Sequence, residues 1–111
     1  MVDTVTPNEL AELVHTTDID LVDVRDEREW LAGHVPGSRP VPLETLRSDP
    51  DAFLDRAKPV VFICARGVRS LTAAKLAERL GYAKIYNLDG GTLAWTKAGL
   101  AVSVEALTIA A

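Results

Sequence analysis

Apolar runs of strand length alternate along the chain with longer stretches whose apolar residues recur at helical spacing. The continuous run VVFI, Val60 to Ile63, predicts a strand in the middle of a sheet that is covered on both faces. Two more strands are predicted at 18–24 (DIDLVDV) and 83–88 (AKIYNL), and 3–5 is compatible with a short first strand. The prolines and glycine around Val41 limit it to a brief edge strand or a turn.

The stretches between these runs carry helix signals. Thr6, Pro7 and Glu9 predict a helix start, with Thr6 as the cap, Pro7 at the first helical position and Glu9 completing a capping box. Shorter helices are expected within 26–34, where Trp30 and Leu31 can be buried, from Asp49 and Pro50 through Phe53 and Leu54, and within 89–99 around Trp95.

The most regular helical pattern follows the VVFI strand, in 70–81 (SLTAAKLAERLG). Its spacing predicts one apolar stripe, with the helix ending at Gly81; the stripe comprises Ala73, Leu76, Ala77 and Leu80. Strands that alternate with helices predict an α/β fold, with a mostly parallel central sheet and helices on both faces.

The length of 111 residues fits a single domain, 1–111. The segment from about 103 to 111, SVEALTIAA, is a mildly apolar tail, and the sequence leaves open whether it packs, pairs with a partner or frays. Hydrophobic residues make up 48% and charged residues 25%, which is typical of a globular protein.

Composition also excludes several classes of partner. A net charge of −4 argues against nucleic-acid binding, and no stretch is long enough to span a membrane. The first ten residues do not resemble a secretory signal, so the cytoplasm is the expected compartment. A single cysteine excludes an internal disulfide, and with two scattered histidines it implies no metal site and no cofactor.

The segment CARGVRS, Cys64 to Ser70, is the strongest candidate for chemistry. Cys64 falls at the carboxyl end of the predicted central strand and Ser70 begins the next helix, so the loop can turn its N–H groups inward as a cradle for an anion. Gly67 permits an unusual backbone angle, while Arg66 and Arg69 add positive charge that would stabilise a thiolate. A lone cysteine after an apolar strand is often only a small buried hydrophobe, but its neighbours here favour a reactive thiol.

Three segments in order resemble a known family: DLVDVRDEREWLAGHVPGS, VVFICARGVRS and NLDGGTLAW. Together they cover nearly the whole chain and are similar to single-domain rhodaneses, which are sulfurtransferases. The resemblance implies that Cys64 is the catalytic cysteine and that the loop binds the substrate anion. The implied substrate-binding residues are Ala65, Arg66, Gly67, Val68, Arg69 and Ser70. Many members have arginine directly after the cysteine, where this chain has Ala65, which bears on substrate choice.

The resemblance also implies a reaction. A Cys64 thiolate would take sulfane sulfur from thiosulfate or a persulfide donor, and pass it from a cysteine persulfide to cyanide or a thiol. One alternative is a sulfur carrier for a partner protein that acts as donor or acceptor. A weaker alternative is a cysteine-dependent phosphatase or arsenate reductase, because in those relatives five residues separate the cysteine from the arginine, whereas four separate Cys64 from Arg69.

Asp23 and Arg25 match an element of the family at the end of an early strand, where the acid lies near the active loop. We expect them to support the site mainly as a structural ion pair or cap. His34 is expected to be a hydrogen-bonded structural residue, and His15 to lie on the surface. Core packing is the expected role of both tryptophans.

Overall fold

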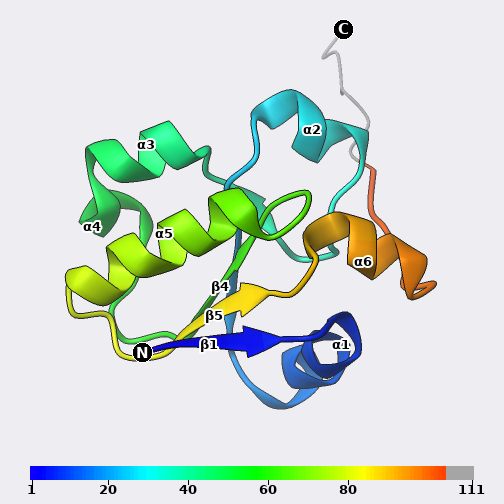
Figure 1. Cartoon of the computed structure of the whole chain (residues 1–111), viewed down its shortest axis with the longest axis horizontal. Helices are drawn as coiled ribbons and strands as arrows, with labels where there is room; N and C mark the ends of the chain where they lie inside the picture. The colour runs from blue at the N-terminus through cyan, green and yellow to red at the C-terminus, as the bar shows by residue number, and fades with distance from the viewer. Residues whose placement is uncertain (105–111) are drawn as a thin grey trace, which may run out of the picture.

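A computed structural model describes residues 1–104 of the chain. Its centre is one sheet of five strands, all parallel, in the order β1-β5-β4-β2-β3 (Figure 1). The strands are β1 (Val2–Val5), β2 (Asp20–Asp23), β3 (Arg39–Pro40), β4 (Val60–Ile63) and β5 (Ile85–Leu88). The predicted α/β fold with a parallel sheet is confirmed.

Helices connect the strands and cover both faces of the sheet (Figure 1). They are α1 (Pro7–Thr16), α2 (Glu27–Ala32), α3 (Leu43–Ser48), α4 (Pro50–Phe53), α5 (Val68–Arg79) and α6 (Gly91–Lys97). Side chains of α3, α4 and α5 pack on one face of the sheet, and those of α1 and α6 on the other. None of the helices within 1–104 has both the length and the apolar character needed to cross a membrane.

The central strand β4 shows how the two cores are divided. Alternate residues of a strand point to opposite faces, so Val60 and Phe62 enter the core beneath α5, while Val61 and Ile63 enter the core beneath α1 and α6. All four β4 residues are buried, as the continuous apolar run predicts.

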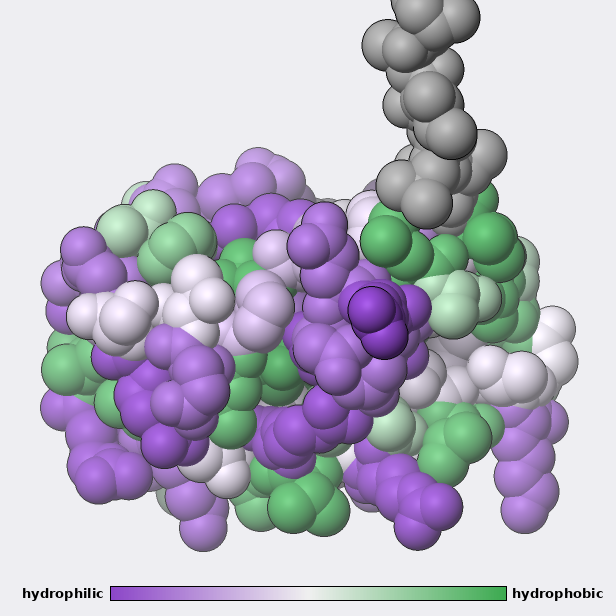
Figure 2. All heavy atoms as spheres, turned by 90° about the horizontal axis from the view of Figure 1, so that it is seen from above, coloured by the Kyte–Doolittle hydropathy of each residue, from purple (hydrophilic) through white to green (hydrophobic). Residues whose placement is uncertain are grey.

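The surface facing the viewer in Figure 2 is mostly hydrophilic, with smaller apolar groups between the polar ones.

Local signals explain where two helices begin. At α1 the Thr6 hydroxyl accepts from the Glu9 N–H at 3.2 Å and the Glu9 carboxylate accepts from the Thr6 N–H at 2.9 Å, so the predicted capping box is confirmed. At α2 a second capping box links Asp26 and Glu29, with 3.0 Å between the Asp26 carboxylate and the Glu29 nitrogen. These bonds satisfy N–H groups that a helix start leaves without partners.

The predicted stripe on α5 is partly wrong. Leu80 lies outside the helix and is 40% exposed, and the buried residues are Ser70, Ala73, Ala74 and Ala77. Helix α5 also begins at Val68, two residues before the predicted start. Leu80 is not part of the buried face because α5 ends at Arg79, one residue before it.

Smaller differences concern the edges of the fold. Helix α3 was not predicted; it buries Leu46 although no side chain caps its start. The edge strand is Arg39–Pro40, and Val41 follows it as a buried core residue. Ser103 pairs with His34 in an isolated antiparallel bridge, whereas 105–111 of the predicted tail lie outside the described residues.

Candidate active site

Cys64 occupies the carboxyl end of the central strand. It follows β4 directly and continues the face of Val60 and Phe62, so its side chain points toward α5. The residue is only 1% exposed. Parallel sheets place their sites at this end of the strands, and the cysteine is therefore where the sequence predicts it.

The start of α6 fixes the backbone of the loop after Cys64. The Thr92 N–H donates to the Cys64 carbonyl oxygen at 2.8 Å, and the Leu93 N–H donates to the Ala65 carbonyl oxygen at 3.1 Å. In a trans peptide the N–H points away from the carbonyl. Because the Ala65 carbonyl faces α6, the Arg66 N–H of the same peptide faces the opposite way, toward the cysteine sulfur.

Gly91 makes this close contact with α6 possible. A Cβ atom built on Gly91 would lie 2.2 Å from the Cys64 carbonyl oxygen and 2.5 Å from the Ala65 carbonyl carbon and oxygen. Its φ of 62° also lies in the left-handed region, which favours glycine. Gly91 is thus the point where α6 rests on the loop.

Several donors surround the sulfur of Cys64. The Gly67 N–H donates to Sγ at 3.1 Å, and Ser70 Oγ lies 3.2 Å from Sγ. Burial raises the pKa of the Cys64 thiol, but hydrogen bonds from the N–H groups of Ser70, Arg66 and Gly67 lower it, as does the Ser70 hydroxyl when it donates to Sγ, and the net direction is downward. The loop therefore stabilises the thiolate, which is the nucleophilic form.

Gly67 and the first turn of α5 supply these donors. Gly67 caps α5 in the left-handed conformation, with φ 93°. Because α5 begins at Val68, Ser70 lies in its first turn, where N–H groups have no partner within the helix. The positive end of a twelve-residue helix therefore faces the sulfur.

A pocket of about 350 Å³ opens over the sulfur. It is lined by Cys64, Ala65, Arg66, Val68 and Arg69, so the structure brings these five predicted residues together. Gly67 and Ser70 contribute from beneath, through their contacts with Sγ. The Val68 side chain is 72% exposed at the rim.

Glu29 of α2 holds the arginine of the loop. Arg69 Nη1 lies 2.8 Å from Glu29 Oε1, and Nη2 lies 3.0 Å from Oε2, so the pair is bidentate. The hydrogen bond from Arg69 is the main cause that lowers the pKa of Glu29 to about 2, and the Arg69 pKa is raised in return. The Cys64 thiolate attracts Arg69 as well, so two negative groups share one guanidinium.

Asp23 and Arg25 form the expected ion pair. The Asp23 carboxylate accepts from Arg25 Nε at 3.0 and 3.1 Å and from Nη2 at 2.8 Å, and both residues are buried. Arg25 Nη2 also donates to the Gly33 carbonyl oxygen at 2.8 Å. Arg25 and Glu29 line a separate groove between α2 and α6, and the charge of Arg25 acts on Glu29, which pairs with Arg69 of the loop.

Trp95 and the two histidines have the expected places, but core packing is wrong for Trp30, which is only partly buried and belongs to neither core. His34 is buried, stacks on the Trp30 ring and has its Nδ1 2.8 Å from the Trp30 carbonyl oxygen. Trp95 is buried in the core beneath α6, and His15 is exposed near the end of α1.

Two polar residues of the site were missed from the sequence. Asn87 of β5 contacts both Ser70 and Gly67, and Glu29 contacts Arg69. The asparagine had a signal, because a polar residue inside an apolar strand run must find a partner when buried. Glu29 had no signal beyond its capping pattern, since it stands forty positions before Arg69 in the sequence.

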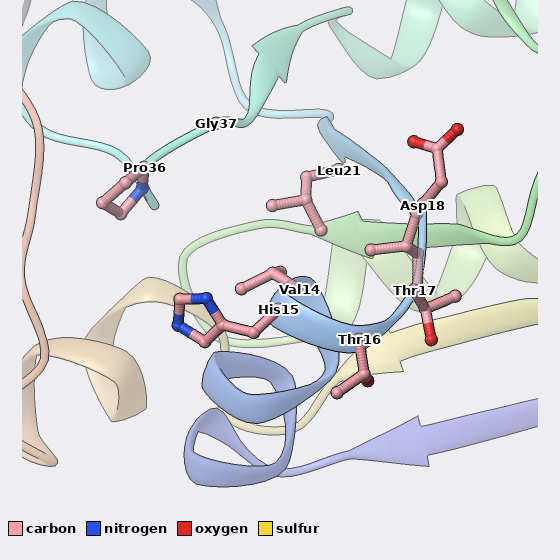
Figure 3. A pocket seen from close by; sticks show the side chains of 9 residues that line it. Val14, His15, Thr16, Thr17, Asp18, Leu21, Pro36 and Gly37 are labelled. Carbon is pink, nitrogen blue, oxygen red and sulfur yellow. The ribbon is translucent and has the colours of Figure 1, made fainter.

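A second hollow, of about 510 Å³, lies at the opposite end of the sheet (Figure 3). Its walls come from the end of α1, the chain entering β2 and the turn at Pro36 and Gly37, as Figure 3 shows. It contains no cysteine, and within 1–104 no group of three or more potential ligands is placed to hold a metal ion.

Comparison with known proteins agrees with this geometry. The family model described as the rhodanese-like domain matches residues 6–98. The chain belongs to the rhodanese-like domain family. This domain is also similar in structure to a rhodanese-related protein from Thermoplasma volcanium, with a TM-score of 0.84 and 29% identity, covering 93% of this chain and 99% of that one.

Curated relatives of this rhodanese-like domain carry sulfurtransferase names. The thiosulfate sulfurtransferase GlpE of Pseudoalteromonas translucida is 33% identical over 91 residues, covering 78% of this chain and 82% of that protein. The probable adenylyltransferase/sulfurtransferase MoeZ of Mycobacterium tuberculosis is 33% identical over 96 residues, and the chain spans only 24% of its length. At the level of the family, the rhodanese-like domain is therefore a sulfurtransferase domain.

Proposed function

We propose that this chain transfers sulfane sulfur through a persulfide on Cys64, with thiosulfate or a small persulfide as donor. The observation that carries the proposal is the environment of Sγ, where backbone N–H groups of Arg66, Gly67 and Ser70 donate to the sulfur and lower the thiol pKa beneath a pocket rimmed by Arg66 and Arg69. Relatives named thiosulfate sulfurtransferase support the choice of donor.

In the first half-reaction the Cys64 thiolate attacks the outer sulfur of thiosulfate. A new S–S bond forms to Sγ, the bond to the sulfonyl sulfur breaks, and sulfite leaves with its electron pair. Donor and leaving group are both anions, so the fixed N–H groups and Arg69 can stabilise the charge as it moves. The step needs no proton donor.

In the second half-reaction an acceptor removes the sulfur. Cyanide or a thiolate attacks the outer sulfur of the persulfide, and Cys64 leaves as the thiolate. The chain contains no second cysteine, so it supplies no resolving thiol of its own. The acceptor is then an external small thiol, cyanide or a cysteine of a partner protein.

Intact mass spectrometry tests this function directly. After exposure to thiosulfate we expect a gain of one sulfur, about 32 Da, which cyanide removes with release of thiocyanate. Cys64→Ser should show neither the gain nor turnover, because an alkoxide is not formed at neutral pH. Full activity in that variant would exclude a Cys64 persulfide.

Two companion assays separate the other candidates. A sulfur carrier would accept sulfur from thiosulfate slowly and from a protein persulfide quickly, so the two uptake rates are compared by the same mass measurement. Hydrolysis of an aryl phosphate, measured beside the sulfur assay, tests the phosphatase alternative. We expect no hydrolysis that depends on Cys64.

A further inference from the structure

A buried polar cluster joins β5 to the loop behind the cysteine. Strand alternation puts Asn87 on the same face as Ile85, toward α5, and Asn87 pairs in register with Phe62 of β4. Asn87 is 8% exposed and Ser70 is fully buried. The side chain of Asn87 therefore faces the first turn of α5, directly behind Cys64.

The contacts close a ring around the loop. Ser70 Oγ lies 2.5 Å from Asn87 Oδ1, and Asn87 Nδ2 lies 3.2 Å from the Gly67 carbonyl oxygen. The Gly67 N–H donates to Cys64 Sγ at 3.1 Å, and Sγ lies 3.2 Å from Ser70 Oγ. Each of the four residues thus contacts two others in the ring.

The chemistry of these groups fixes the direction of the ring. A carbonyl oxygen only accepts, so the Asn87 amide must turn its NH₂ group toward Gly67 and its oxygen toward Ser70. The amide oxygen has no proton, so the Ser70 hydroxyl is the donor in that contact. A hydroxyl has only one proton, and Ser70 consequently presents a lone pair to Cys64, which suits a protonated thiol.

We propose that Asn87 is a positioning residue that holds the Ser70 proton away from the Cys64 sulfur in the resting protein. When Cys64 is a thiolate, Ser70 can donate to Sγ only by giving up Asn87. Asn87 and the thiolate therefore compete for one proton. The inference rests on the proposed function for its purpose, which is to adjust the nucleophile of sulfur transfer.

Other charged groups near Cys64 act independently of this competition. Arg69 attracts the thiolate but is paired with Glu29, and Arg66 lies exposed at the rim of the pocket. From β2, Asp23 and Arg25 neutralise one another on the other face of the sheet. None of these groups contacts Ser70 or Asn87 through a hydrogen bond recorded within 1–104, so substitutions at Asn87 leave their charges in place.

Competition for the proton has a use in catalysis. The intrinsic nucleophilicity of a thiolate falls as its pKa falls, and an attacking thiol works best with a pKa near the ambient pH. The backbone donors already lower the pKa of Cys64. By withholding one more donor, Asn87 keeps the thiolate a stronger nucleophile.

Two substitutions matched in size test the proposal, Asn87→Leu and Asn87→Asp. Both remove the amide NH₂, but only aspartate keeps an acceptor for the Ser70 proton. We expect Asn87→Leu to release Ser70 and lower the Cys64 pKa by about 0.5 to 1 unit, the size of one net hydrogen bond. Asn87→Asp should leave the pKa unchanged or raise it. The pKa is read from the rate of alkylation of the single cysteine against pH.

The rate at high pH gives a second readout. With Asn87→Leu, the plateau of the alkylation rate should fall about twofold to threefold, because a less basic thiolate is less reactive. The Leu substitution is repeated in a Ser70→Ala background, where no proton remains to be released. There we expect no further change in the Cys64 pKa.

Several results would overturn the proposal. A Cys64 pKa that is unchanged or raised in Asn87→Leu would do so. So would an Asn87→Asp variant whose Cys64 pKa is lowered as much as in Asn87→Leu. A third such result is that Asn87→Leu still lowers the Cys64 pKa in the Ser70→Ala background. Thermal unfolding checks each variant, and Asn87→Ala, which carries the same prediction, replaces Asn87→Leu if that variant does not fold. Because these measurements use no sulfur donor, failure to form a persulfide would refute the proposed function and leave the competition at Ser70 standing.

Discussion

Replacing Gly91 with alanine should displace the loop that follows Cys64. The new Cβ would lie 2.2 Å from the Cys64 carbonyl oxygen, a distance that no real Cβ tolerates, so α6 must move away from the loop. That movement breaks the hydrogen bonds from Thr92 and Leu93, at 2.8 and 3.1 Å. Each lost bond costs about 1 kcal/mol, and the left-handed backbone costs alanine about 1 to 2 kcal/mol more. We therefore expect the free energy of unfolding to fall by roughly 3 to 4 kcal/mol in total.

Gly99→Ala is the matched control. Gly99 has a similar positive φ of 79°, but a Cβ there would meet nothing within 4 Å. The Gly99→Ala variant should lose only about 1 to 2 kcal/mol of unfolding free energy, which is the contribution of the left-handed backbone. The two variants thus differ by the steric displacement alone, which is worth about 2 kcal/mol.

Urea and thermal unfolding measure both variants, and sulfur uptake by Cys64 is followed in parallel. A gap of about 2 kcal/mol corresponds to roughly 8 °C in Tm for a domain of this size. Gly91→Ala should also take up sulfur more slowly, because the Cys64 and Ala65 carbonyls are then no longer held by α6 and the loop N–H groups lose their orientation toward Sγ. Equal unfolding free energies for Gly91→Ala and Gly99→Ala would refute the steric argument.

Three further predictions concern the charges around the loop. Glu29→Gln should lower the Cys64 pKa, because the charge of Arg69 is then free to act on the thiolate. The loss in unfolding free energy should be below about 1 kcal/mol, since the ion pair is partly exposed. The Glu29 pKa is about 2, whereas the ordinary pKa of a glutamate is 4.5. The pair of Glu29 and Arg69 therefore stabilises the fold fully above pH 4.5, and this stabilisation is lost as the pH falls toward 2. The stability of the wild type, measured by urea unfolding, should approach that of the variant over this window, and a constant difference would contradict the argument. Alkylation of Cys64 should reach half its maximal rate at a lower pH than a solvated cysteine does, because its pKa is lowered; an equal midpoint would be incompatible with the loop donors. Asp23→Ala leaves Arg25 buried without its carboxylate partner, so the free energy of unfolding, measured in urea, should fall by about 3 kcal/mol. A fall below about 1 kcal/mol would contradict a structural role for the pair.

The parts of the fold that local chemistry determines were predictable. The run VVFI has no polar residue, and only a strand covered on both faces accommodates it. The capping box of Thr6 and Glu9 is specified within four residues of sequence. The placement of Cys64 followed from these elements, since a strand that leads directly into a helix leaves little freedom for the loop between them.

Contacts between distant segments were not predictable in the same way. The face of α5 was wrong at Leu80 because helical spacing alone does not say where the helix ends, and α5 ends at Arg79. Small residues such as Ala74 took the buried positions. The partner of Arg69 depends on where α2 lies relative to α5, which no local pattern gives. Asn87 could have been marked as buried and hydrogen-bonded, but not matched to Ser70.

The three motif segments meet at the loop, and each contributes a different physical property. The middle segment supplies the sulfur and its donors, the first supplies Glu29 to hold Arg69, and the last supplies Asn87 and Gly91. Gly91 orients the loop backbone, whereas Asn87 directs one hydroxyl proton, so a variant at the first should change stability and rate together and a variant at the second should change the thiol pKa. The reactivity of the cysteine therefore depends on residues outside the loop as well as on the donors within it.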